Sequence, residues 1–185
     1  PNPHGLTRDD IAAIHLYTQE NPLYGVLNAA LRNAQRASVK PYWGFIKLLQ
    51  MALFKLPKST NTSVHRGIQI RWGPEGHTGE VSLQDRQAAL AELEAELRLK
   101  QGTSQPLIWW GFSSTSTSLP AVQNFLKPEP PDTVLGPRVI FTIDGGSSAR
   151  NVQRYSAIQS EAERLLPAGS VFTVKTIGSP APDLL

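Results

Sequence analysis

Cysteine is absent from the 185-residue chain. Its absence excludes a disulfide framework, a thiol nucleophile and cysteine-ligated zinc. It fits a reducing, intracellular compartment, while a secreted location stays open. Long apolar runs are missing too: none reaches 18 consecutive residues, so the sequence predicts no transmembrane helix. The first residues lack a charged segment followed by an apolar one, so we expect no signal peptide in this stretch.

Common signatures of catalysis and ligand binding are also absent. The sequence contains no Walker loop, no Gly-x-Gly-x-x-Gly turn, no Gly-x-Ser-x-Gly elbow and no His-Glu-x-x-His pair. The four histidines are scattered without the spacing of metal ligands, and they are His4, His15, His65 and His77. We therefore expect no metal site and no histidine base, which leaves carboxylates for acid–base chemistry.

What the chain does contain is an ordinary globular composition, with 40% hydrophobic and 18% charged residues. Its length suits a single domain spanning residues 1–185.

The net charge of +3 conceals an asymmetry, since residues 1–72 carry +6 and residues 73–185 carry −3. A basic first half suits a phosphate-bearing ligand and equally fits an ordinary solvated surface. No tight basic cluster interleaved with aromatics occurs, so a nucleic-acid partner is not expected.

Helices are predicted for the first third of the chain. Thr7 and Asp10 have the spacing of a capping box, and apolar residues then recur at helical intervals to about Tyr17. Two further helices are expected at about 23–36 and 44–56. Lysines surround the apolar face of the last one, which fits a core helix or an interfacial membrane helix.

Strands are predicted for most of the remainder. Helices are expected there at 83–101, capped by Ser82, and at 121–127, with turns or loops at 73–79 and 128–136. The expected strands are 63–72, 107–118, 138–143, 164–166 and 171–176. Because helices come first and strands follow, the pattern predicts an α+β fold, with a helical lobe at about 1–60 and a β-rich part at about 61–185.

Arg66 and Gly67 form the first of three segments that can carry chemistry. An arginine inside a strand projects from the sheet, where its planar guanidinium could grip a phosphate or form an ordinary surface salt bridge. Gly67 has no Cβ, so a flat ligand could approach the backbone there.

Residues 113–118 form the second segment, six hydroxyl side chains in a row. Such a run is typical of flexible linkers, but two tryptophans and a phenylalanine just before it supply a hydrophobic anchor that linkers rarely have. In an extended chain Ser114 and Ser116 share one face, with Thr115 on the other. The two hydroxyls on one face could bond a ribose or orient another side chain.

Glu161 and Glu163 form the third segment. Glutamates at i and i+2 share one face if the chain is extended or bulged, and they diverge if it is helical. The apolar residues that follow favour a strand. Paired carboxylates near a sugar suit glycosidic chemistry, where one stabilises an oxocarbenium-like centre and another handles the nucleophile's proton. A solvated turn would explain the same pair.

In this order the three segments resemble the mono-ADP-ribosyltransferases of the Arg-Ser-Glu class, the clade of vertebrate ecto-enzymes and clostridial-type toxins. Residues 66–67 are similar to the first motif, 114–116 to the second and 161–163 to the third. Residues 13–18 and 27–32 resemble the helical lobe of the ecto-enzymes, so the resemblance covers nearly the whole chain. One difference is that the vertebrate surface enzymes carry disulfides.

The resemblance implies a helical lobe on a split β-sandwich and a monomer that uses NAD, without a metal, to transfer ADP-ribose to arginine on an acceptor protein. Arg66 would hold the NAD phosphates and nicotinamide ribose, and the backbone of Gly67 would bond the nicotinamide carboxamide. Ser114 would orient Glu163 and line the cleft together with Thr115 and Ser116. Glu163 would bond the ribose 2′-hydroxyl and stabilise the oxocarbenium ion.

The resemblance also implies a substrate-recognition loop at about 155–160, followed by Glu161, which would engage the incoming guanidinium. The recognition residues expected from it are Tyr155, Ser156, Gln159 and Glu161. Two other readings stay open at this point. Water in place of the acceptor would make the protein an NAD glycohydrolase, and loss of turnover would make it a silent NAD- or protein-binding module.

Overall fold

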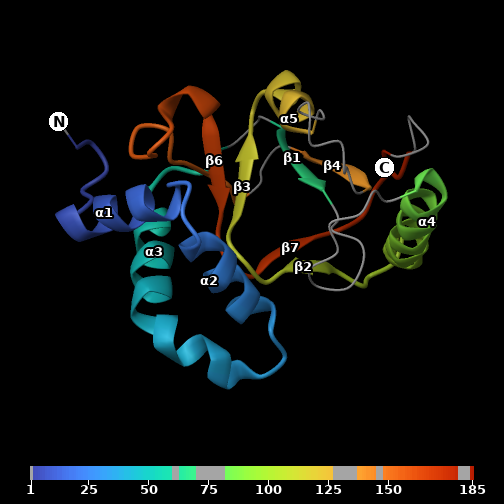
Figure 1. Ribbon diagram of the computed structural model, residues 1–185. Helices are drawn as coiled ribbons and strands as arrows, with labels where there is room; N and C mark the ends of the chain where they lie inside the picture. Colours follow the sequence, from blue (N-terminus) through green and yellow to red (C-terminus); the bar gives the residue numbers. More distant parts are fainter. Residues whose placement is uncertain (1, 60–62, 70–81, 127–136, 145–147, 179–183) are drawn as a thin grey trace. The chain divides into compact units, whose positions relative to one another are not determined.

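The computed structural model describes residues 2–59, 63–69, 82–126, 137–144, 148–178 and 184–185 (Figure 1). The turn expected at 73–79, the loop expected at 128–136 and the end of the first expected strand lie outside these ranges. The chain forms two compact units, each made of three stretches. The first unit is Pro1–Val64, Ile108–Ser118 and Ile143–Ser170, and the second is His65–Leu107, Leu119–Thr142 and Val171–Leu185.

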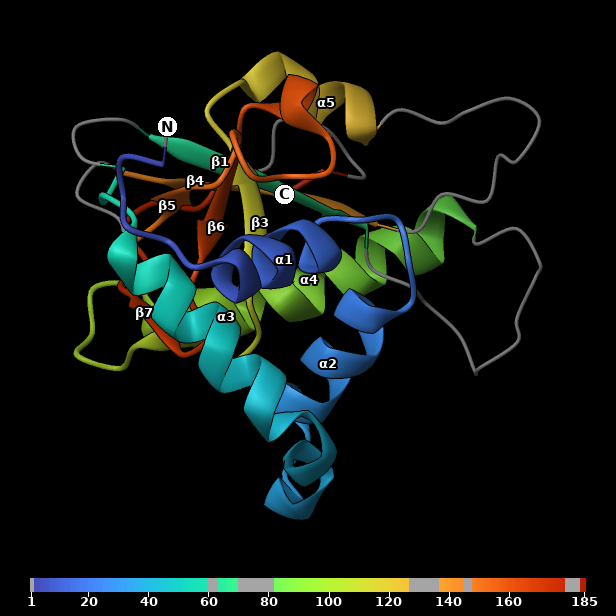
Figure 2. The ribbon, with the colours of Figure 1, turned by 90° about the vertical axis from the view of Figure 1, so that its left-hand side faces the viewer.

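The predicted capping box begins α1 (Arg8–Tyr17) in the first unit. The Thr7 hydroxyl accepts the backbone N–H of Asp10 at 3.1 Å, and the Asp10 carboxylate accepts the N–H of Thr7 at 2.7 Å. The Asp10 side chain is buried and accepts a hydrogen bond from Lys55 Nζ at 2.6 Å, and Lys55 is the last residue of α3 (Trp43–Lys55). The cap therefore also joins α1 to α3, which lie side by side in Figure 2.

The second helix is shorter than predicted, because α2 (Leu23–Arg32) ends before Asn33. The backbone of Asn33 is extended, and its side-chain oxygen accepts the N–H of Gln35 at 2.8 Å. Such a local side-chain bond offers the backbone an alternative to the helix. The chain continues into a 3₁₀ helix, η1 (Arg36–Tyr42), which leads into α3.

The third helix occupies the predicted position within one residue. The interpretation of it as a core helix is confirmed. Ile46, Leu49 and Leu53 of α3 are buried. No helix among the residues that the structure describes is long and apolar enough to cross a membrane.

Three antiparallel strands complete the first unit in the order β3 (Ser113–Ser116), β6 (Glu163–Leu166) and β5 (Arg150–Asn151). A 3₁₀ turn, η2 (Gln159–Glu161), precedes β6. Figure 1 shows α1, α2 and α3 on one side of β3 and β6. The core between them includes Ile14, Leu27, Leu49, Leu53, Phe112, Val152, Tyr155 and Leu165.

Phe112 is the hydrophobic anchor of the hydroxyl-rich segment. It is only 1% exposed, packs edge-on against Tyr17 and accepts a hydrogen bond from the Tyr17 hydroxyl at 3.1 Å. The first four residues of the serine and threonine run after it form strand β3, so the prediction that the run is no flexible linker is confirmed.

The second unit contains α4 (Leu83–Lys100), α5 (Leu119–Phe125) and all but one end residue of β1 (Val64–Gln69) and of β4 (Arg138–Ile143), with β4 beside β1. Ser82 caps α4 by accepting the N–H of Asp85, as predicted. Leu90 and Leu97 of α4 pack with Val139 in a second core. The two remaining strands are β2 (Leu107–Trp109) and β7 (Ser170–Phe172). The predicted α+β class is therefore correct.

Candidate active site

Glu163 is a buried carboxylate at the first position of β6, with 5% of its surface exposed. Ser114 Oγ donates a hydrogen bond to Glu163 Oε1 at 2.6 Å. Ser114 pairs with Leu165 in the register between β3 and β6, so Glu163 lies diagonally across the two strands and on the same face. The sheet register therefore brings together two side chains 49 residues apart.

A second hydroxyl, that of Ser156, holds the other oxygen of the same carboxylate. Ser156 Oγ lies 2.9 Å from Glu163 Oε2, and Ser156 is 3% exposed. Each oxygen of Glu163 thus accepts one charge-assisted hydrogen bond, and such bonds are stronger than neutral ones. The resemblance placed Ser156 in the recognition loop but gave no sign of this contact. An irregular loop has no fixed period, so its sequence does not predict which way each side chain points.

Ser116 and Thr115 bond to the chain around Glu163. The Ser116 hydroxyl donates to the carbonyl of Glu161 at 3.1 Å, and the Thr115 hydroxyl donates to the carbonyl of Arg164 at 2.6 Å. Ser114 and Ser116 share one face of β3, as expected for an extended segment, and Thr115 lies on the opposite face. All three hydroxyls of the second motif therefore contact the segment that carries the glutamates.

The chain between the two glutamates is kinked. Ala162 has φ 49° and ψ 39°, the only left-handed conformation of a non-glycine residue among those described. Arg164 Nη1 donates to the carbonyl of Ala162 at 3.0 Å and to Asn151 Oδ1 at 3.0 Å, so its guanidinium holds the kink. Glu161 ends a 3₁₀ turn, and the strand begins only at Glu163.

Glu161 lies at the surface on the other side of this kink. Its partial desolvation by the surrounding chain raises its pKa above the usual 4.5, and the negative charges of Glu163 and Glu20 raise it further. Glu161 therefore binds a proton more readily than an ordinary glutamate does.

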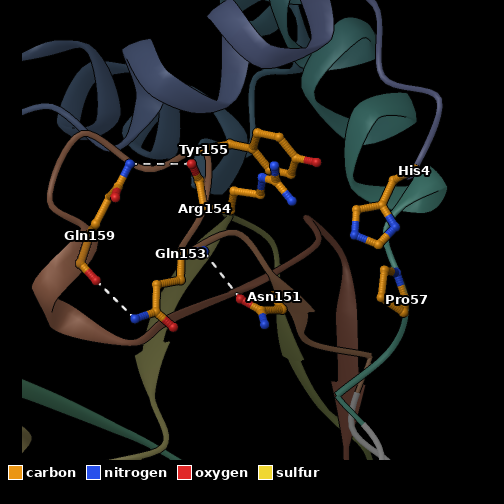
Figure 3. A pocket seen from close by; sticks show the side chains of 7 residues that line it. All are labelled: His4, Pro57, Asn151, Gln153, Arg154, Tyr155 and Gln159. Carbon is orange, nitrogen blue, oxygen red and sulfur yellow. Dashed lines mark hydrogen bonds between the residues drawn. The ribbon is translucent and has the colours of Figure 1, made fainter. Parts of the chain in front are cut away.

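The loop at 155–160, the expected recognition loop, is tied to the two residues before it by hydrogen bonds (Figure 3). Gln153 Nε2 donates to the carbonyl of Gln159 at 2.9 Å, and Gln159 Nε2 donates to the carbonyl of Arg154 at 3.3 Å. Tyr155 is 8% exposed and packs edge-on with His4. A cavity of about 420 Å³ beside the loop is lined by His4, Pro57, Asn151, Gln153, Arg154, Tyr155 and Gln159.

Of the four recognition residues expected from the resemblance, only Gln159 and Glu161 are exposed. Tyr155 belongs to the core, and Ser156 is enclosed beside Glu163. The side chains of these two residues therefore have little surface to offer an acceptor.

Arg66 and Gly67 lie in β1, in the second unit, and Arg66 is half-buried. A Cβ on Gly67 would lie 2.9 Å from Val122 Cγ1 and 2.9 Å from Leu126 Cγ. The missing side chain of Gly67 thus makes room for α5 and the residue that follows it. This packing is a second reason for glycine, beside the open approach to the backbone predicted from the sequence.

The described parts of the chain hold no group of three or more histidine, aspartate or glutamate side chains that could bind a metal ion. The features that stand out are instead a clamped buried glutamate, an exposed glutamate before it and an arginine in the middle of a strand. The two glutamates, which both belong to the first unit, form a carboxylate pair of a kind that suits glycosyl transfer.

The model of the NAD:arginine ADP-ribosyltransferase family matches residues 1–181, so the chain belongs to this family. It uses NAD as a substrate and transfers ADP-ribose to arginine. The α+β architecture is that of this family, as the resemblance implied. A search of curated proteins finds no match.

Solved structures of several ADP-ribosyltransferases share the fold at low sequence identity. Vis of Vibrio splendidus, in complex with agmatine, is 20% identical with a TM-score of 0.66, covering 97% of this chain and 72% of Vis. The C3 exoenzyme of Clostridium limosum is 18% identical with a TM-score of 0.63, covering 96% and 82%. The eukaryotic ART2.2 is 17% identical with a TM-score of 0.61, covering 97% and 64%.

Proposed function

We propose that Glu163 is the catalytic glutamate of this arginine ADP-ribosyltransferase and that Glu161 receives the acceptor guanidinium. One observation carries the proposal: a buried carboxylate held at both oxygens and, one kinked residue away, an exposed carboxylate with a raised pKa. Two carboxylates in such different surroundings suit two different roles.

Cleavage of NAD is the step assigned to Glu163. Positive charge develops on the ribose C1′ as its bond to nicotinamide breaks and nicotinamide leaves with the electron pair. The fixed negative charge of Glu163 stabilises that centre and bonds the ribose 2′-hydroxyl. One well-placed group of this kind is typically worth about 10²–10³ in rate.

Binding of NAD is assigned to Arg66, Gly67 and the serines of β3. Arg66 grips the phosphates and the nicotinamide ribose with its planar fork, and the backbone of Gly67 bonds the nicotinamide carboxamide. Ser114 and Ser116 keep the glutamate segment in place and line the site, and no metal takes part. These groups contribute through geometry, without transferring a proton.

Transfer to arginine is the step assigned to Glu161. Its carboxylate pairs with the guanidinium and accepts a proton while a guanidinium nitrogen forms the new bond to C1′. Its raised pKa makes it a better base than an ordinary glutamate. The structure of Vis in complex with agmatine, a small guanidinium compound, supports this class of acceptor.

Gln159, exposed two residues before Glu161, is the other side chain that we assign to contact with an acceptor protein. Since one chain supplies every group named, we propose that the monomer is active.

Labelled NAD tests the proposal, with agmatine or poly-arginine as acceptor. Labelled acceptor is the expected result, whereas free ADP-ribose alone would mean a glycohydrolase and no turnover a binding module. Glu163→Gln removes the charge and keeps the volume, so nicotinamide release should fall by about 10² or more with the melting temperature preserved. A variant that kept more than about a tenth of wild-type turnover would contradict the role of Glu163.

A further inference from the structure

Ser156 connects the backbone of the recognition loop to the catalytic carboxylate. Its hydroxyl lies 2.9 Å from Glu163 Oε2 and 3.2 Å from the backbone nitrogen of Ile158. The Ile158 carbonyl is a more distant partner at 3.5 Å. A hydroxyl has one proton to donate, and the charged oxygen is both the nearer and the stronger acceptor. Ser156 therefore accepts from Ile158 and donates to Glu163.

One hydroxyl is not enough to fix a carboxylate. The terminal torsion of a glutamate joins an sp³ carbon to an sp² carbon and has a broad, roughly two-fold profile, so a single donor leaves the carboxylate plane free to rotate. Ser114, on β3, holds Oε1, and Ser156, on the loop, holds Oε2. Two donors from different elements fix the plane as well as the position.

The loop that carries Ser156 is itself held in place. The backbone N–H groups of Tyr155 and Ser156 donate to the carbonyl of Val152 at 2.8 and 2.9 Å. On the other side of Ser156, the N–H of Ala157 donates to Thr18 Oγ1 at 2.8 Å. A donor supported in this way holds its partner more accurately than one on a free loop.

We propose that Ser156 is a positioning residue for Glu163 and not a contact of the acceptor. The inference rests on the proposed role of Glu163 and gives the recognition loop two separate tasks. Glu161 and Gln159, exposed at its end, meet the acceptor. Ser156, enclosed beneath it, orients the carboxylate that stabilises the oxocarbenium ion.

The two roles predict different kinetics for Ser156→Ala. A positioning residue acts on the cleavage step that hydrolysis and transfer share, so both nicotinamide release and agmatine labelling should fall by the same factor. We expect a fall in kcat of about 10- to 100-fold, the range for a lost hydrogen bond to a charged group, with KM for NAD largely unchanged. A contact of the acceptor would instead lower agmatine labelling and leave hydrolysis intact.

Ser170→Ala is a matched control, since Ser170 is another buried serine of the same unit whose hydroxyl donates to the backbone carbonyl of Pro167 at 2.7 Å. It should lower the melting temperature about as much as Ser156→Ala and leave kcat nearly unchanged. A second pair, Ser156→Thr and Ser156→Val, compares side chains of similar size with and without the hydroxyl. The threonine variant should be the more active of the two.

Three results would overturn the inference: wild-type turnover in Ser156→Ala, a loss confined to agmatine labelling, or equal activity of the threonine and valine variants. Glu163→Gln, assayed in parallel, separates this failure from that of the proposed function. If Glu163→Gln is inactive and Ser156→Ala is not, only the role of Ser156 is wrong. If Glu163→Gln stays active, the role of Glu163 itself is wrong.

Discussion

Thr18 and Ala157 join the end of the first helix to the recognition loop, since Thr18 Oγ1 accepts the backbone N–H of Ala157 at 2.8 Å. Thr18 is the C-cap of α1, and Glu20 follows two residues later. The link thereby holds a further carboxylate close enough to Glu161 for the charge of Glu20 to contribute to the raised pKa of Glu161. The helical lobe thus takes part in the electrostatics of Glu161, the proposed acceptor contact.

Glu20→Gln should move the acid limb of agmatine labelling to lower pH. Neutralising Glu20 removes one of the charges that raise the pKa of Glu161, so the pKa falls toward its usual 4.5 and the base form persists at lower pH. A pH series of labelling measures the limb. Glu96→Gln, an exposed change of the same kind on α4, is the control and should leave it in place. An unmoved limb in Glu20→Gln would show that Glu161 is not the titrating base.

Glu161→Gln should separate the two activities. An amide cannot pair with a guanidinium as a carboxylate does, nor take its proton, yet it leaves Glu163 and its two serine donors intact. Labelling of agmatine should fall by about 10² or more, the usual worth of general-base catalysis, while nicotinamide release to water largely survives. Equal loss of both activities would place Glu161 in NAD cleavage, and no loss would make it a solvated turn residue.

The periodic parts of this chain were predictable from sequence because their signals are local. The capping box at Thr7 and the apolar stripe of α3 give helices at the predicted places, and β4 has its predicted bounds. The end of α2 was predicted four residues too late, because the Asn33 side chain competes with the helical backbone. Strand β5, only two residues long, has no pattern to detect.

The site was predictable in its motifs and in the contact between Ser114 and Glu163, but not in the rest of its geometry. Ser114 and Glu163 are named by the resemblance, but the second donor, Ser156, comes from an irregular loop. The left-handed backbone of Ala162 was equally hidden, because alanine carries no preference for that conformation, and the hydrogen bond from the Arg164 guanidinium to its carbonyl has no sequence signal. Contacts of this kind are set by tertiary structure.

Arg66→Lys should raise KM for NAD by roughly 10-fold or more and change the melting temperature little. Lysine keeps the charge and loses the planar fork needed for bidentate phosphate contacts, and hydrogen bonds between charged groups are worth about 1.5–3 kcal/mol. Arg98→Lys is a matched control in the same unit, since the fork of Arg98 bonds Glu94 on the surface of α4. An unchanged KM, measured by initial rates of nicotinamide release, would make Arg66 a structural residue.

Asp10→Asn should destabilise the protein at neutral pH, and the loss should shrink in acid. Burial alone would raise the pKa of Asp10, but its hydrogen bond from Lys55, the two from Thr7 and the charge of Lys55 together lower it below the usual 3.8. A carboxyl whose pKa is lowered on folding contributes stability above its unfolded pKa and loses it as the pH falls through the folded value. We expect the free energy of unfolding to differ by about 1.5–3 kcal/mol between wild type and variant near pH 7, as for hydrogen bonds to a charged group, and the difference to narrow below about pH 4.

Denaturant unfolding at several pH values measures this difference. Asp9→Asn is the control, because Asp9 is the exposed neighbour in the same helical turn. A difference that stayed constant from pH 7 to pH 3 would mean that the ion pair with Lys55 contributes nothing and that asparagine weakens α1 in some other way.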